Sequence, residues 1–334
     1  METIDRVLEG RGAAGIAVVG AGAETVWVPT SADDEPAYLA YSITKTFTAT
    51  VMLQLDDERR LSLDDRLARW YPRVDRADRI SLRRLLDHTA GIPDYGRLDS
   101  YHDAVRASPS MPWSLERFAA ETFDKGLLFE PGTGWAYSNP GYMLLKRIAE
   151  VASGQSFGEM IRERFARPLG LARTFVPESP ADLATLAPAT STALSIDRAP
   201  REVRGVYHPG WVSHGVIAST PSDIARFVDA LFRRHLLPDR SIREMTTLVP
   251  IGPEIAAGAG SWRKPGYGLG IMGDPESSWG RLWGHNGGGP GYTTSVMHAP
   301  DLGGASVCAM CAVEGDARAE QIVFTVLDTL RRAP

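Results

Sequence analysis

Segments typical of β-strands lie near both ends of this chain, whereas the middle shows the periodicity of helices. Strands are predicted at residues 14–19, 24–28, 38–41, 267–272, 281–283, 293–298 and 305–313. The first two are separated by Gly20 and Gly22 and are typical of a hairpin. The economical arrangement is one antiparallel sheet built from both chain ends and flanked by helices, with a helical region inserted between its two parts. The predicted fold class is therefore α/β.

The spacing of apolar residues predicts helices over much of the remaining chain. The expected helices are residues 2–9, 44–57, 62–71, 81–87, 141–151, 157–165, 223–233 and 318–330. Residues 177–204 show no clear periodicity and are predicted to form a surface loop. On this pattern we expect a sheet subdomain from residues 1–59 and 236–334, and an all-α subdomain from residues 60–235.

Charge and hydropathy exclude two classes of partner. The net charge is −5, and nucleic-acid binding needs a basic surface, so nucleic acid is not an expected partner. The most apolar stretch, residues 13–23, has 11 residues, whereas a membrane span needs about 20. The N-terminal residues include acids and lack the apolar core of a secretory signal, so we expect a cytoplasmic location.

The two cysteines, Cys308 and Cys311, lie three residues apart in a segment that is predicted to be a buried strand. Residues at this spacing on a strand point to opposite faces, so the pair can neither form a disulfide nor share a metal ion. We therefore expect both cysteines to pack in the core. The sequence implies neither a metal nor an organic cofactor.

The strongest chemical signal is Ser42 followed by Lys45 at the start of the predicted helix 44–57. Residues three apart on a helix lie on one face, so the hydroxyl and the amine can meet. A serine becomes a nucleophile when a neighbouring base takes its proton, and a buried lysine can be that base whereas arginine cannot. Only four of the 36 basic residues are lysines, so a lysine at this position indicates a function.

The same spacing occurs at Ser261 and Lys264, where Pro265 and Gly266 follow immediately. A helix cannot continue through these two residues, so a loop is predicted. Ser261 and Lys264 are therefore not expected to lie on one face of a helix. For Ser42 the alternative interpretation is an ordinary helix cap.

A second motif, Tyr137 followed by Asn139, is the only Y-x-N in the chain. A tyrosine hydroxyl beside a lysine can relay the serine proton and protonate a leaving group. The Asn139 side chain offers a donor and an acceptor for a substrate amide. A packed tyrosine beside a helix cap is the alternative interpretation.

A third motif, His285 followed by Gly287, lies in a glycine-rich segment that is predicted to form the edge of a strand. Glycines there let a substrate lie close to the backbone. We expect the N–H of Gly288 to complete an oxyanion hole, together with a backbone N–H at the start of the Ser42 helix.

The order S-x-x-K, Y-x-N and H-x-G resembles the family of class C β-lactamases, D-Ala-D-Ala carboxypeptidases, D-aminopeptidases and related esterases. Supporting stretches are residues 85–95, 129–133, 214–223 and 267–270. The resemblance spans residues 5–325 and implies a single catalytic domain with a β-lactamase/transpeptidase-like fold, in which the active site lies between the sheet and the all-α subdomain. It also implies that Ser42 is the nucleophile and that Lys45 and Tyr137 share the role of base.

Departures from the family pattern bear on the substrate. Typical β-lactamases of the family have K-T-G where this chain has His285, and Gly288 replaces a Ser or Thr that often helps to hold a substrate carboxylate. These differences favour esters or amides over substrates with a free C-terminal carboxylate, and they argue against efficient β-lactam hydrolysis. His214 is a candidate substrate contact near the acyl pocket, with a packed histidine as the alternative, and His88 is expected to be structural.

The predicted function is a serine hydrolase that forms an acyl-enzyme on Ser42 and acts on a small ester, amide or D-amino-acid peptide. The first alternative is an acyltransferase or peptide-cyclising enzyme that uses the same acyl-enzyme. The second is a sensor that is acylated without turnover, against which the intact Lys45 and Tyr137 argue. The expected partner is a small-molecule or short-peptide acyl substrate, with no cofactor, no metal, no nucleic acid and no membrane span.

Overall fold

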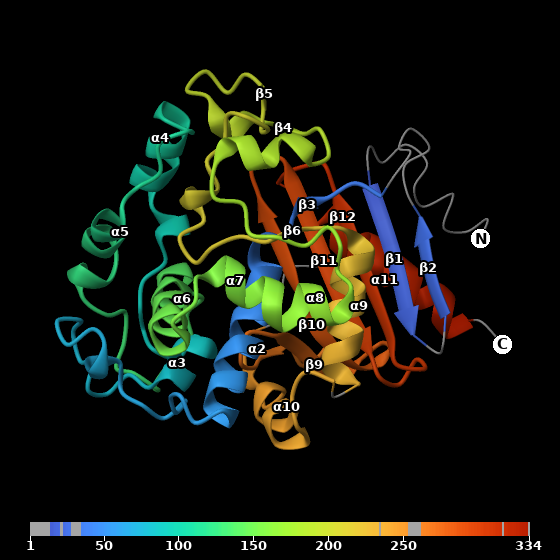
Figure 1. Cartoon of the computed structure of the whole chain (residues 1–334), viewed down its shortest axis with the longest axis horizontal. Coiled ribbons are helices and arrows are strands. Elements are labelled where there is room, and N and C mark those ends of the chain that lie inside the picture. Colours follow the sequence, from blue (N-terminus) through green and yellow to red (C-terminus); the bar gives the residue numbers. More distant parts are fainter. Residues whose placement is uncertain are drawn as a thin grey trace.

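The frame of the molecule is an eight-stranded antiparallel sheet, in a computed structural model that describes residues 14–20, 23–27, 35–233, 235–252, 262–315 and 317–332 (Figure 1). The strands follow the order β2-β1-β12-β11-β10-β9-β8-β7. Their bounds are β1 Ala14–Gly20, β2 Ala23–Trp27, β7 Val249–Pro250, β8 Gly266–Tyr267, β9 Met272–Ser277, β10 Gly280–Gly289, β11 Tyr292–Ala299 and β12 Ala305–Cys311. Because β1 pairs with both β2 and β12, the N-terminal hairpin joins the C-terminal strands, as the sequence predicts.

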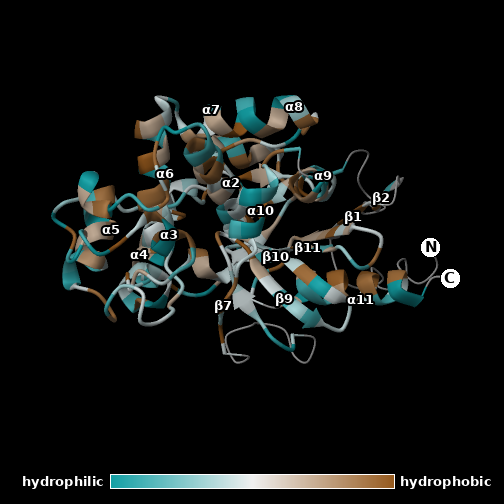
Figure 2. Ribbon diagram, turned by 90° about the horizontal axis from the view of Figure 1, so that it is seen from below, coloured by the Kyte–Doolittle hydropathy of each residue, from teal (hydrophilic) through white to brown (hydrophobic). Residues whose placement is uncertain are grey.

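Helices cover both faces of this sheet. Their bounds are α2 Thr44–Asp57, α3 Leu82–Leu86, α4 Asp99–Ala107, α5 Leu115–Glu121, α6 Asn139–Ser153, α7 Phe157–Ile161, α8 Arg167–Leu169, α9 Pro221–Phe232, α10 Asp239–Met245 and α11 Arg318–Arg332. Figure 2 shows α11 on one side of the sheet and α2 and α9 on the other. Helices α3 to α6 gather at the side of the molecule farthest from β1 and β2 (Figure 1).

Two short strand pairs lie among the helices, β3 Tyr38–Leu39 with β6 Ala218–Ser219, and β4 Thr190–Ser191 with β5 Arg201–Glu202. The segment 177–204, which the sequence predicts as a loop, therefore contains both strands of the β4–β5 pair as well as short 3₁₀ turns. The α/β fold class is confirmed. The division into subdomains stays a prediction, and α9, in the range assigned to the all-α subdomain, packs against β1 and β12.

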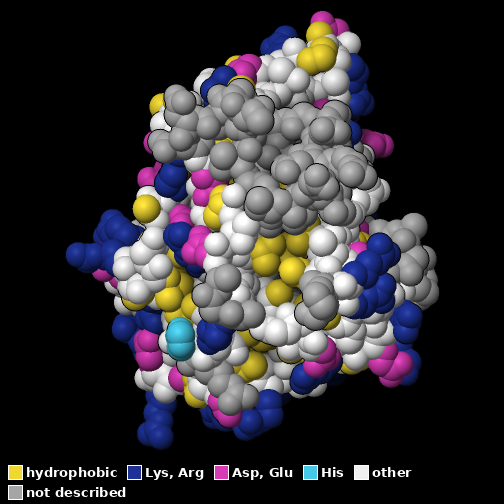
Figure 3. All heavy atoms as spheres, turned by 90° about the vertical axis from the view of Figure 1, so that its right-hand side faces the viewer, with side chains coloured by type: hydrophobic (Ala, Val, Ile, Leu, Met, Phe, Trp, Pro, Cys, Tyr) yellow, Lys and Arg dark blue, Asp and Glu magenta, His cyan; other side chains and the backbone are white. Residues whose placement is uncertain are grey.

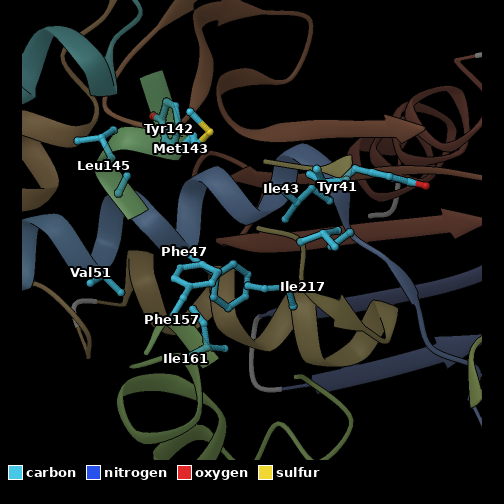
Figure 4. Packing of buried hydrophobic residues seen from close by; sticks show 14 of the residues in the cluster. Tyr41, Ile43, Phe47, Val51, Tyr142, Met143, Leu145, Phe157, Ile161 and Ile217 are labelled. Atoms are coloured by element: carbon cyan, nitrogen blue, oxygen red, sulfur yellow. The ribbon is translucent and has the colours of Figure 1, made fainter. Parts of the chain in front are cut away.

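Two apolar clusters hold the layers together. The larger one surrounds α2, where Phe47 stacks on Phe227 of α9 at a centroid distance of 3.5 Å, and α6 packs along the same helix (Figure 4). The smaller one lies between the sheet and α11. Cys308 belongs to the first cluster and Cys311 to the second, so the two thiols face opposite sides of β12, as the strand spacing predicts.

Some expected elements are absent or differently bounded. The predicted helix 62–71 is wrong: only a 3₁₀ turn forms at Leu67–Arg69, because the backbone there bonds across to Ala77 and Ile80. The predicted strand 267–272 is divided between β8 and β9, since Gly270 adopts a φ of 69° and its carbonyl accepts a hydrogen bond from the Thr46 hydroxyl (2.8 Å). Helices α4, α5 and α10 were not predicted, and the predicted helix 2–9 lies outside the described residues.

Charged side chains of both signs are interspersed on the face seen in Figure 3. Among the residues that the structure describes, no helix has the length and apolar character needed to cross a membrane.

Candidate active site

The chain enters the site through a tight turn between β3 and α2. A 3₁₀ turn at Tyr41–Ile43 leads directly into the helix, and Tyr41 has a φ of 45°, in the left-handed region that side chains rarely adopt. The Tyr41 hydroxyl donates a hydrogen bond to the carbonyl of Pro290 (2.6 Å), which ties this conformation to the β10–β11 turn. The result is that Ser42 stands at the head of α2, one turn before Lys45.

Ser42 lies between the side chains of Tyr137 and Lys45, the two residues that the sequence predicts to share the role of base. The Tyr137 hydroxyl donates to Ser42 Oγ (2.8 Å), and Lys45 Nζ lies 3.2 Å from the same oxygen. Lys45 Nζ also lies 2.7 Å from Asn139 Oδ1 and 3.2 Å from His214 Nε2. Three predicted site residues, Ser42, Asn139 and His214, therefore surround the Lys45 amine, and Tyr137 reaches the same cluster through Ser42.

Burial sets the protonation of this cluster. Lys45 is fully buried, and loss of hydration lowers its pKa to about 7, although the nearby Asp94 carboxylate acts in the opposite direction. Burial raises the pKa of Tyr137 far above its usual value. Near neutral pH the amine is thus available as a base, whereas the tyrosine remains a neutral phenol.

A neutral amine can make three hydrogen bonds in this cluster. In the neutral form its lone pair can accept a hydrogen bond from the Ser42 hydroxyl, which lies 3.2 Å away, while its two hydrogens point to Asn139 Oδ1 and His214 Nε2. Burial and the proximity of Lys45 lower the pKa of His214 well below its usual value, so its imidazole is neutral and able to accept. His214 also lines the cavity above Ser42, so it is both a neighbour of the lysine and accessible to a ligand.

Helix α6 holds Asn139 in place. The Ser138 side chain caps the helix by accepting from the Gly141 N–H (3.1 Å), and Pro140 suits the first turn. The Asn139 N–H donates to Asp94 Oδ1 (2.9 Å), and the asparagine side chain also bonds this carboxylate. Burial raises the pKa of Asp94. Sequence reasoning missed Asp94 as a site residue, although it lies in the supporting stretch 85–95.

His88 supports the Tyr137 loop from behind. Its Nδ1 accepts from the Ser138 N–H (3.2 Å), its carbonyl accepts from the Ala136 N–H (3.0 Å), and its ring lies 4.4 Å from that of Tyr137 between centroids. These contacts are those of a structural residue.

His285 on β10 faces the site but is engaged by other groups. Its Nδ1 lies 2.6 Å from the Asn286 carbonyl and its Nε2 lies 2.8 Å from the Tyr267 hydroxyl. A carbonyl can only accept, so Nδ1 carries the proton and Nε2 accepts from Tyr267. Burial, followed by the proximity of Lys45, lowers the pKa of His285 to about 3. His285 is thus a neutral residue that lines the site. The centroid of its ring lies 6.5 Å from that of the Tyr137 ring.

The glycines after His285 let β10 pass beside the nucleophile. A Cβ at Gly287 would lie 2.4 Å from the Ala40 carbonyl oxygen and 3.1 Å from the Ser42 nitrogen, so a side chain cannot fit there without displacing the turn. A Cβ at Gly288 would meet no atom within 4 Å. Open space therefore lies beside Gly288, next to the segment that contacts the Ser42 backbone.

Ser42 opens into two cavities. The larger, of about 850 Å³, is lined by residues that include Asn139, His214, Gly288 and Glu320. The smaller, of about 300 Å³, lies beside Tyr137 and His285. A bound acyl compound can therefore extend to either side of the serine.

The antiparallel sheet, the inserted helices and a serine placed beside a lysine and a tyrosine define the class of proteins with a β-lactamase/transpeptidase-like fold. The family model described as Beta-lactamase matches residues 2–327, and this chain belongs to that family.

The chain is similar to several characterised proteins. It is 30% identical over 276 residues to penicillin-binding protein 4* of Bacillus subtilis, covering 78% of this chain and 57% of that one. It is 28% identical to the lovastatin esterase of Penicillium rubens over 86% of this chain and 83% of the esterase. It spans 49% of penicillin-binding protein 4 of Amycolatopsis lactamdurans, so the match covers about half the length of these two penicillin-binding proteins.

Solved structures share the fold over nearly the whole chain. A D-stereospecific amidohydrolase from Streptomyces sp. has a TM-score of 0.83 and 30% identity, covering 97% of this chain and 98% of that one. The D-amino acid amidase of Ochrobactrum anthropi, complexed with D-phenylalanine, has a TM-score of 0.82 at 24% identity, with 99% of both chains covered. At that identity the second likeness concerns the fold alone.

Proposed function

We propose that this chain is a serine hydrolase in which Ser42 forms an acyl-enzyme with a small ester, amide or D-amino-acid peptide. The observation that carries the proposal is the position of Ser42 Oγ, which lies 3.2 Å from the amine of buried Lys45 and accepts a hydrogen bond from Tyr137. Relatives named as an esterase, a D-aminopeptidase and a D-stereospecific amidohydrolase support this class of reaction.

Acylation follows from these positions. The Ser42 hydroxyl gives its proton to Lys45 Nζ while Oγ bonds to the substrate carbonyl carbon, and the carbonyl π electrons move to the oxygen. The backbone N–H groups of Ser42 and Gly288 stabilise the resulting oxyanion. When the oxyanion collapses, the bond to the leaving alcohol or amine breaks, and the proton passes from Lys45 through the Tyr137 hydroxyl to the leaving group.

Deacylation uses the same groups. Water attacks the Ser42 ester and gives a proton to Lys45, and the acid product departs as Ser42 regains its proton. The lowered pKa of Lys45 and the raised pKa of Tyr137 support the lysine as the base and the tyrosine as a neutral relay. An amine or alcohol in place of water would give acyl transfer with no change in the catalytic groups.

Covalent labelling tests the proposal. A fluorophosphonate probe is expected to add one adduct to the intact protein, and peptide mapping is expected to place it on Ser42. Ser42→Ala is expected to lose the label and to lower turnover of p-nitrophenyl acetate by on the order of 10⁴-fold or more. Ser108→Ala, at an exposed residue after α4, is the matched control. Retention of half the activity by Ser42→Ala would exclude this mechanism.

A further inference from the structure

We propose that the larger cavity contains a subsite for a positively charged amine, formed by Glu320 and Asn286 on the α11 side of β10, and that preferred substrates carry an ammonium group. This inference rests on the proposed function, because it names a substrate class for the same site.

The first observation is a buried carboxylate with one unused oxygen. Glu320, in the first turn of α11, is only 3% exposed. Its Oε1 accepts from Asn286 Nδ2 (2.6 Å) and from Trp262 Nε1 (3.2 Å). Its Oε2 has no hydrogen-bond partner among the described residues, and neither does Asn286 Oδ1. Glu320 and Asn286, which are joined by one hydrogen bond, thus each have a second oxygen that accepts no hydrogen bond from the described residues.

The second observation is that further polar atoms lie on the same face of the sheet. Asn286 pairs with Ser295, and Gly288 pairs with Thr293, so the side chains at these positions point to one face. The hydroxyl oxygens of Thr293 and Ser295 are also buried and, within the described chain, without partners. Asn286, Thr293 and Glu320 line the same cavity as Ser42. No atom lies within 4 Å of a Cβ built at Gly288, so the surface of β10 is open at this position.

The third observation is the sign of the charges around the cavity. Its lining includes the carboxylates of Glu314 and Glu320, and none of the described lining residues is a lysine or an arginine. A substrate carboxylate beside Glu320 would therefore meet the unpaired acceptor oxygens of Glu320 and Asn286, and no lysine or arginine among the lining residues. An ammonium group has three donors and no acceptor, and it forms charge-assisted hydrogen bonds with carboxylates. Burial raises the pKa of Glu320, and a bound cation would favour the ionised form.

Glu314 offers a matched control within the same cavity. Its Oε1 already accepts from the N–H (2.7 Å) and the hydroxyl (3.0 Å) of Thr192, and its Oε2 accepts from the Gly291 N–H (3.1 Å). Both oxygens of Glu314 are therefore occupied, whereas one oxygen of Glu320 is not.

The test compares phenylalanine methyl ester with its N-acetyl derivative, for both enantiomers, in a pH-stat assay at pH 7. The enzyme is expected to prefer the ester with the free ammonium group, for at least one enantiomer, by about tenfold or more in kcat/KM. Glu320→Gln is expected to remove most of this preference, whereas Glu314→Gln is expected to keep it. The proposal is overturned if the enzyme shows no preference, or if Glu320→Gln, folded as judged by circular dichroism, retains it.

A second measurement needs no variant. Benzylammonium is expected to inhibit p-nitrophenyl acetate turnover competitively and about tenfold more strongly than benzyl alcohol, which has the same shape without the charge. Equal inhibition would overturn the subsite. A protein without esterase activity would contradict the proposed function instead, and calorimetric binding of benzylammonium would then decide the subsite: binding that Glu320→Gln abolishes supports it, and no binding overturns it.

Discussion

Two segments of this chain have a serine and a lysine at the same spacing, and the structure gives their lysines opposite surroundings. Lys45 is fully buried at the head of α2, within hydrogen-bonding distance of Ser42, Asn139 and His214. Lys264 precedes β8 and pairs on the surface with Glu276 (2.6 Å), with side chains 63% and 56% exposed. Its partner in the motif, Ser261, lies outside the described residues.

The difference between Lys45 and Lys264 shows that burial of the lysine, and not the serine–lysine spacing alone, makes the amine able to act as a base. An amine in water keeps its proton and is well solvated, whereas an amine enclosed by α2, α6 and the segment before β6 loses hydration and becomes a base near neutral pH. Helical geometry brings the hydroxyl and the amine together, but it is the enclosing elements that change the acidity of the amine.

The largest effect is expected from removing each amine in turn. Lys45→Met, which keeps the length of the side chain without the base, is expected to lower kcat/KM for p-nitrophenyl acetate by on the order of 10³-fold. Lys264→Met is expected to leave kcat/KM nearly unchanged and to alter the free energy of unfolding by less than about 1 kcal/mol, because exposed ion pairs contribute little. Steady-state kinetics and denaturant titration measure both. Similar losses in the two variants would remove the distinction between the sites.

The second largest effect is expected from a side chain added at Gly287, because the backbone around Ser42 leaves no space for one. Gly287→Ala would place a methyl group 2.4 Å from the Ala40 carbonyl oxygen and is expected to shift the nucleophile turn, with a loss of about 100-fold in kcat. Gly288→Ala adds the same methyl group one residue later, where the space is open, and is expected to keep the melting temperature of the unmodified protein. Equal melting temperatures and equal kcat values for the two variants would contradict this geometry.

The pH profile tests the burial of Lys45 directly. The base must be unprotonated, and its pKa is lowered to about 7, so kcat/KM for p-nitrophenyl acetate is expected to rise about tenfold per pH unit below pH 7 and to level off above it. The profile is measured at constant ionic strength, with the spontaneous hydrolysis of the ester subtracted. A rise that continues toward pH 10 would show that the amine is hydrated like a surface lysine.

The smallest effect is expected at His214. His214→Phe removes a neutral acceptor from the protonated form of Lys45, so the pKa of the lysine falls further and the acidic limb of the profile is expected to move to lower pH, with a loss of up to about tenfold in kcat/KM. His214→Gln, which keeps an acceptor, is expected to restore the limb. A change in KM with an unshifted limb in both variants would instead assign His214 to substrate binding.

Much of the fold was predictable because its patterns are local. The helix 44–57 and the hairpin of β1 and β2 agree with their apolar periodicity, and the glycine and proline signals place α6 and α9 correctly to within a few residues. The predicted helix 62–71 failed because tertiary hydrogen bonds to Ala77 and Ile80 replaced the helical ones. Helix α4 was missed because it is short and largely exposed, with Val105 as its single fully buried residue.

The candidate site was predictable to the extent that its residues stand in short motifs. Ser42, Lys45, Tyr137 and Asn139 were selected from spacing and resemblance, and the structure joins them in a series of hydrogen bonds, from Tyr137 to Ser42, from Ser42 to Lys45 and from Lys45 to Asn139. Asp94 carries no motif of its own, since its importance depends on a contact with α6.

The amino-acid sequence by itself determined which residue types were available and where the chain can turn: a serine and a lysine one helical turn apart, and glycines where β10 passes the nucleophile. Only the tertiary structure decided which lysine is dehydrated, which histidine touches it, and that Glu320 and Asn286 face the same cavity as Ser42. The physical reason is that hydrogen-bond geometry over three or four residues is a local property, whereas desolvation depends on elements that are distant in the chain and enclose a group together.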